Sequence, residues 1–69
     1  MTSLYVGITD CGTLLDPPNG QVDLTGTGDG SEATYTCSEG YVLIGTEVRT
    51  CQSNGNWSSE EPLCECEWE

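Results

Sequence analysis

A chain of 69 residues with a net charge of −11, one Arg, no Lys and no His has room for one small domain and is strongly acidic. A single cation cannot neutralise a phosphate backbone or an anionic membrane surface, which excludes nucleic acid and acidic lipid as partners. The absence of His removes imidazole acid–base and metal-ligand chemistry, and no apolar run is long enough to insert across a membrane.

The chain has few apolar residues but five cysteines, at positions 11, 37, 51, 64 and 66. Leu, Ile and Val make up about 17% of the chain and Phe is absent, which with this charge is typical of disordered polypeptides. The cysteines therefore predict a disulfide framework and an extracellular compartment. Four paired cysteines allow three connectivities, between which the sequence itself does not choose. Zinc is disfavoured because only Cys64 and Cys66 are close together, at a spacing too tight for zinc ligands.

Turn residues divide the chain into short segments with strand character. Pro17-Pro18-Asn19-Gly20 predicts the first turn, because Pro fixes φ and Asn-Gly tolerates positive φ. Residues 25–31 predict a flexible exposed loop, and residues 52–56 another turn. No helical period occurs, so we expect an all-β fold of short antiparallel strands. The expected strands are Gln21–Leu24, Ala33–Cys37, Tyr41–Ile44 and Thr46–Cys51.

A set of residues at defined spacings carries a family resemblance. In chain order it comprises Cys11, Pro17-Pro18-Asn19-Gly20, Tyr35-x-Cys37, Gly40-Tyr41-x-Leu43-x-Gly45, Cys51, Gly55-x-Trp57 and Pro62-x-Cys64. This pattern resembles the sushi domain, also called the complement control protein module or short consensus repeat. The match covers residues 11–64. Residues 1–10, which lack the features of a signal peptide, are then a lead-in or linker, and residues 65–69 an acidic tail or the start of a next segment.

The resemblance implies a shape and a disulfide pairing. Family members are small, disulfide-stapled, elongated modules with their two ends near opposite poles. They join the first cysteine to the third and the second to the fourth, which here gives Cys11–Cys51 and Cys37–Cys64. Cys66 lies outside this framework and is either unpaired or bonded to another chain.

The resemblance also implies a core and a function. Trp57 would lie buried against the disulfides, with Tyr35 and Tyr41 near it. Sushi domains occur in tandem in complement regulators, adhesion receptors, cytokine receptors and secreted proteases, where they bind proteins or act as spacers, without catalysis or cofactors. We expect a non-catalytic extracellular recognition module with neighbouring extracellular domains. The alternative is a spacer with no partner. The Gly-rich, polar loop at 25–31 favours this alternative. A secreted inhibitor would need an exposed anchor residue on a rigid loop, and none is found.

The candidate partner surface is the acidic C-terminal segment. Carboxylates spread along a chain are typical of a solvated surface that keeps a module soluble. Their density is highest over residues 60–69, where the field would attract a basic partner in a salt-sensitive way. The candidate contacts are Glu60, Glu61, Glu65, Glu67 and Trp68. Interfaces favour aromatic residues and Arg, and only Arg49, Tyr5 and Trp68 are available outside the predicted core.

Two further motifs concern modification and metal binding. Asn56-Trp57-Ser58 is a glycosylation sequon, although a buried Trp in its middle would hinder modification. Calcium is not expected, because the chain has no DxDxDG loop and Asp29-Gly30-Ser31-Glu32 is too short to bind the ion by itself.

Overall fold

The computed structural model describes residues 10–67, and within them the chain forms five strands and no helix. The strands are β1 (Gly20–Leu24), β2 (Glu32–Cys37), β3 (Tyr41–Ile44), β4 (Val48–Thr50) and β5 (Leu63–Cys66). All pairings between these strands are antiparallel, which confirms the predicted all-β fold. In the described part of the chain, no helix is long and apolar enough to cross a membrane.

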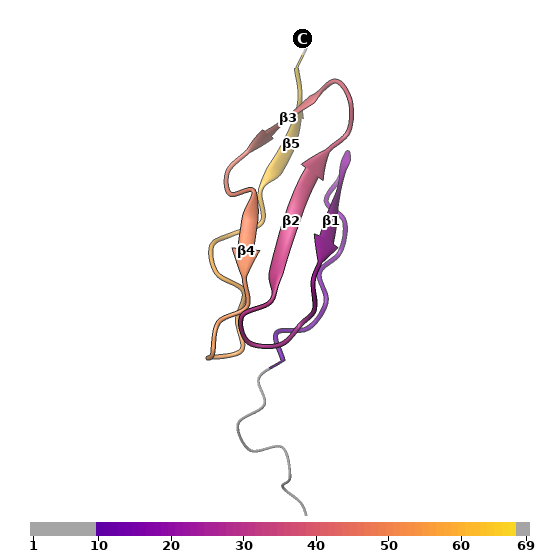
Figure 1. Ribbon diagram of the computed structural model, residues 1–69. Coiled ribbons are helices and arrows are strands. Elements are labelled where there is room, and N and C mark those ends of the chain that lie inside the picture. Colours follow the sequence, from indigo (N-terminus) through magenta and orange to yellow (C-terminus); the bar gives the residue numbers. More distant parts are fainter. Residues whose placement is uncertain (1–9, 68–69) are drawn as a thin grey trace, which may run out of the picture.

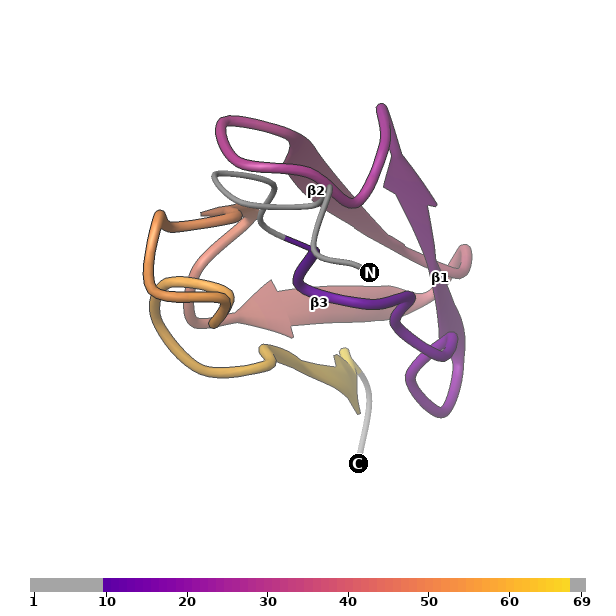
Figure 2. The same ribbon diagram turned by 90° about the horizontal axis from the view of Figure 1, so that it is seen from below.

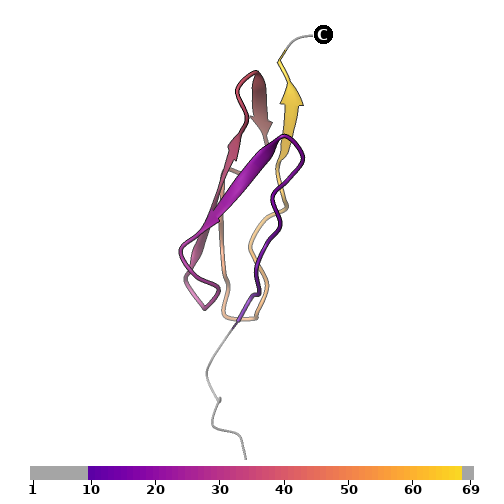
Figure 3. The ribbon, with the colours of Figure 1, turned by 90° about the vertical axis from the view of Figure 1, so that its right-hand side faces the viewer.

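The strands form two sheets that follow one another along an elongated molecule (Figures 1 and 3). β2 lies between β1 and β4 in the three-stranded sheet, and β3 pairs with β5 in the two-stranded sheet. Seen along the long axis, the strands and connecting segments are arranged around the centre of the molecule (Figure 2). The first and last described residues lie at opposite ends of the molecule (Figure 1).

Side-chain alternation places one face of the three-stranded sheet against the core. In β2, Ala33 and Tyr35 are buried, whereas Glu32 and Thr36 are exposed. The register pairs Leu24 with Ala33 and Val22 with Tyr35, so the half-buried face of β1 continues the same apolar layer. Residues directly opposite each other in antiparallel strands project to the same side, which explains why the two alternations match.

The core is small and depends on aromatic residues and a disulfide. Its buried members are Ala33, Tyr35, Cys51 and Trp57. Half-buried apolar residues pack against them, namely Cys11, Leu14, Val22, Leu24 and Leu43. The Trp57 indole donates a hydrogen bond to the Gly12 carbonyl over 3.0 Å, which satisfies its only polar group.

Two disulfides join distant segments, Cys11–Cys51 with Cα atoms 5.8 Å apart and Cys37–Cys64 with Cα atoms 5.5 Å apart. These are the same two pairs that the family resemblance implies. Cys51 belongs to the core, whereas Cys37 and Cys64 join the end of β2 to β5. By chain entropy, each bond contributes roughly 3.5–4 kcal/mol, comparable to the whole stability of a domain of this size.

The first turn brings the backbone close to the second disulfide. The Gly20 amide donates to the Pro17 carbonyl over 3.1 Å, and Asn19 has a φ of 64°. Pro18 and Asn19 therefore occupy the central positions of a type II turn, which needs positive φ at its third residue. A Cβ at Gly20 would lie 2.6 Å from Cys64 Sγ and 2.8 Å from the Thr36 carbonyl oxygen, so this position has no room for a side chain.

Three elements differ from the sequence-based expectation. β4 spans only Val48–Thr50 instead of Thr46–Cys51, because Gly45, with a φ of 115°, and the residues after it form a bend. β5 was not predicted, since its residues do not alternate between apolar and polar. Tyr41 is half-buried and is not among the residues of the core cluster or those packed against it, although Leu43 of the same strand is.

The loop at 25–31 is hydrogen-bonded to the rest of the fold and is not the free loop that its composition predicted. The Thr27 carbonyl accepts from the Cys11 amide over 2.7 Å, and Gly28 forms a β-bridge with Asp10. At the far end of the loop, the Cys51 amide donates to the Ser31 carbonyl over 2.8 Å. The loop is therefore held against both cysteines of the first disulfide.

Candidate interaction surface

Arg49, the only cationic side chain in the sequence, is half-buried and lies directly opposite the buried Ala33. Its Nε donates to the Ser58 carbonyl over 2.9 Å, and its terminal nitrogens donate to the Tyr35 hydroxyl and the Ser59 carbonyl. These contacts tie β4 to the segment that precedes β5. Arg49, which the sequence offered as an interface residue, thus has a structural role beside a buried phenol.

Every Asp and Glu between residues 10 and 67 is exposed. Of the predicted contacts, Glu60 and Glu61 precede β5, Glu65 lies within it and Glu67 follows it. Because an extended chain rises about 3.3 Å per residue, Glu61 and Glu67 are separated by up to about 20 Å. These carboxylates therefore follow one another along the C-terminal segment. Trp68 and Tyr5 lie outside the described residues.

Asp10 has an ordered environment despite its exposure. Its carboxylate accepts a hydrogen bond from the Gly12 amide over 2.9 Å. That bond, together with one from the Thr27 side chain, lowers the pKa of Asp10, because both favour the charged form. The contacts hold the first described residues against the loop at 25–31.

The outer face of the two-stranded sheet carries apolar side chains. Ile44 in β3 and Leu63 in β5 are directly opposite each other and are 48% and 56% exposed. Val42, also exposed, lies on the same face opposite Glu65. Sequence reasoning missed this surface because it did not predict β5, without which Leu63 cannot be placed beside Ile44.

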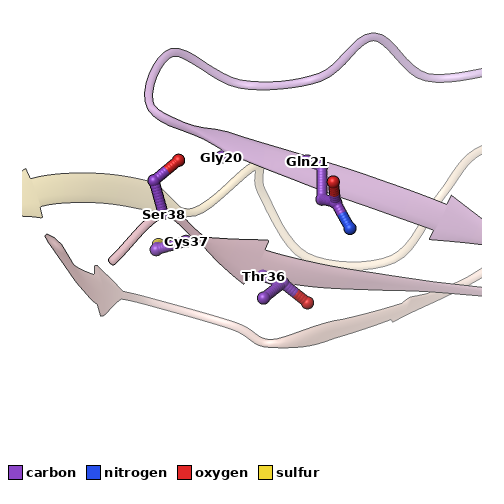
Figure 4. A pocket seen from close by; sticks show the side chains of 5 residues that line it. All are labelled: Gly20, Gln21, Thr36, Cys37 and Ser38. Carbon is purple, nitrogen blue, oxygen red and sulfur yellow. The ribbon is translucent and has the colours of Figure 1, made fainter. Parts of the chain in front are cut away.

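Hollows in the described surface lie beside β2. One, of about 230 Å³, is lined by residues from β1 and β2 and from the turn after β2 (Figure 4). The lining residues are Gly20, Gln21, Thr36, Cys37 and Ser38. The other, of about 350 Å³, lies where β2 and β3 meet, and Glu47 is its only carboxylate. Two phenols, those of Tyr35 and Tyr41, line the same hollow as Glu47.

The remaining predicted residues concern modification and metal binding. The Asn56 side chain is exposed, whereas Trp57 is buried and Ser58 Oγ accepts from the Thr50 amide over 2.9 Å. Cys66 ends β5, lies opposite Tyr41 and is an exposed free thiol. No group of three or more Cys, Asp or Glu side chains able to hold a metal ion occurs between residues 10 and 67.

A small, elongated β-module cross-linked by two disulfides is a class of domain typical of secreted proteins and receptor ectodomains. The family described as Sushi repeat (SCR repeat) matches residues 11–66, and the chain belongs to this family. The resemblance read from the cysteine, Trp and Gly-Tyr spacings is thereby confirmed.

Several proteins with sushi repeats are similar to this chain. Human Sushi domain-containing protein 2 is 43% identical over 58 residues, which cover 84% of this chain and 7% of that protein. Membrane cofactor protein from Bos taurus is 49% identical over 61 residues, covering 80% of this chain and 17% of that protein. Human sushi repeat-containing protein SRPX is 43% identical over 61 residues, which cover 86% of this chain and 13% of that protein. The chain thus spans less than a fifth of each of these relatives.

Proposed function

We propose that the chain is a non-catalytic, extracellular protein-recognition module of a longer multidomain protein, and that its partner presents a basic surface. The observation that carries the proposal is the charge arrangement. All described carboxylates are exposed, whereas Arg49, the only cation, is half-buried and donates hydrogen bonds to Ser58, Tyr35 and Ser59. Such a surface attracts basic proteins and repels phosphate backbones and anionic membranes.

The family and the fold support this proposal. Sushi repeats occur in multidomain proteins such as membrane cofactor protein, and they are typically non-catalytic. The two disulfides suit an oxidising compartment.

The test is salt-dependent capture of a partner. The oxidised chain, carrying Cys66→Ser to prevent artefactual dimers, is immobilised and exposed to extracellular fluid of its source at about 50 mM and about 500 mM NaCl. We expect a basic protein to be retained at low salt and released at high salt. Glu60→Gln/Glu61→Gln should weaken retention more than Asp23→Asn/Glu32→Gln, which removes the same charge from the three-stranded sheet. Retention that is independent of both salt and charge would contradict the proposal.

A spacer is the second candidate function. The opposite positions of the two described ends favour it, because such a module sets a distance between its neighbours (Figure 1). If the spacer describes the whole role, no protein is retained at either salt concentration. The hydrogen bonds of the loop at 25–31 weaken the sequence-based argument for a spacer, since that argument assumed a loop without structure.

A further inference from the structure

We propose that the outer face of β3 and β5 is a docking surface for a basic protein segment with apolar side chains between its Lys or Arg residues. The proposal rests on the proposed function and assigns it to one face. The face comprises Val42, Ile44 and Leu63, with Glu65 at one edge, and we call it the β3–β5 face.

The distribution of apolar residues singles out this face. In the described part of the chain, the large apolar side chains that are exposed are Leu15, Val42, Ile44, Val48 and Leu63. Three of them gather on a sheet of two four-residue strands. A chain this poor in apolar residues needs its few for the core, and grouped exposed ones are typical of interaction sites.

The inner face of the same sheet packs against the core. Leu43 is half-buried and packs against the core, and Cys64, directly opposite it, is held by the disulfide to Cys37. The strands are therefore fixed without the outer side chains. Val42, Ile44 and Leu63 remain exposed on the other face, where a partner can reach them.

The charges around the face define the chemistry of the occupant. Glu65 lies directly opposite Val42, Glu61 precedes Leu63 by two residues, and Glu67 follows Glu65 by two. An apolar centre with carboxylates at its ends is complementary to an apolar segment that carries cations. A second copy of the chain fits poorly, because each copy carries a net charge of −11.

The test is an NMR titration of the ¹⁵N-labelled, oxidised chain carrying Cys66→Ser. The probes are three synthetic peptides that alternate Lys with Val, Lys with Ser, and Glu with Val. We expect the Lys–Val peptide to shift the amides of 42–44 and 63–65. The Lys–Ser peptide should bind more weakly and the Glu–Val peptide should leave these amides unchanged.

A matched pair of variants completes the test. Leu63→Ser should weaken binding of the Lys–Val peptide about tenfold, whereas Leu15→Ser, at an exposed Leu outside the face, should leave it unchanged. Ile44→Ser should behave like Leu63→Ser, and the dispersion of each spectrum reports whether the variant is folded.

Three results would overturn the assignment of the face. The first is that both Lys peptides bind equally and shift amides elsewhere on the molecule, a result that would still agree with recognition by charge. The second is an equal loss in Leu15→Ser and Leu63→Ser. The third is a shift of the same amides on concentrating the chain without peptide, which would make a second copy the occupant. Salt-independent capture, by contrast, contradicts the proposed function itself.

Discussion

At the scale of single residues, the one Arg of the chain has a structural role. Arg49 satisfies the Tyr35 hydroxyl and two carbonyls of the 58–59 segment, so one side chain anchors both a buried phenol and the approach to β5. An Arg can do this because its planar guanidinium presents several donors in a fixed geometry. The exposed surface is acidic as a consequence, since no second cation exists.

Gly20→Ala should destabilise the fold. The added Cβ would meet Cys64 Sγ and the Thr36 carbonyl oxygen well inside van der Waals contact, and neither atom can move without disturbing the disulfide or β2. We expect a loss of about 1–3 kcal/mol in the free energy of unfolding, measured by urea denaturation.

The matched control is Gly26→Ala, where the nearest atom to the new Cβ is the Ser31 hydroxyl at 2.9 Å. A hydroxyl can rotate away, so the control should lose less stability. Equal losses in the two variants would contradict the argument from close approach.

At the scale of elements, the local sequence pattern predicts some strands, whereas another forms through pairing with a distant segment. Gln21–Leu24, Ala33–Cys37 and Tyr41–Ile44 alternate or are apolar within themselves, so the sequence predicted β1, β2 and β3 nearly to their bounds. β5 forms only because β3 lies beside it, and no property of residues 63–66 alone shows that. The acidic segment was found by composition, whereas the β3–β5 face required the register of two strands.

The two disulfides should differ in their effect on the core. Replacing Cys37 and Cys64 by Ser should lower the free energy of unfolding by about 3.5 kcal/mol through chain entropy. Replacing Cys11 and Cys51 should cost more, because Cys51 is buried beside the Trp57 cluster and a Ser there loses packing as well.

Urea denaturation followed by Trp57 fluorescence, in a Trp68→Phe background, measures both effects. The Trp57 emission should be red-shifted less in Cys37→Ser/Cys64→Ser than in Cys11→Ser/Cys51→Ser. A larger loss for the Cys37–Cys64 pair would argue against the core position of Cys51.

At the scale of the whole molecule, repulsion among the carboxylates destabilises the folded state. With a net charge of −11 on 69 residues, the folded chain brings carboxylates closer together than the unfolded chain does. Screening by salt should therefore stabilise the fold, unlike a fold whose surface depends on ion pairs.

Raising NaCl from about 20 mM to about 500 mM should increase the Tm by about 5 °C, equivalent to about 1 kcal/mol for a domain of this size. Differential scanning calorimetry measures the shift. The increase should be smaller in a variant with Glu60, Glu61, Glu65 and Glu67 changed to Gln, which carries less charge. A Tm that falls with salt would show that attraction and not repulsion dominates the surface.

The positions of the two disulfides have a mechanical consequence. A pulling force applied at the two poles enters at Cys11 and leaves through Cys64, and the Cys11–Cys51 bond offers it a covalent shortcut. Only the stretch between Cys51 and Cys64 lies on the shortest path between these points. Residues 37–51, which contain β3 and β4, form a parallel path through the Cys37–Cys64 bond that is only one residue longer, so extension stops once these two stretches are taut, whereas β1 and β2 lie on a longer path. A string of such modules would behave as a tether of nearly fixed maximum length.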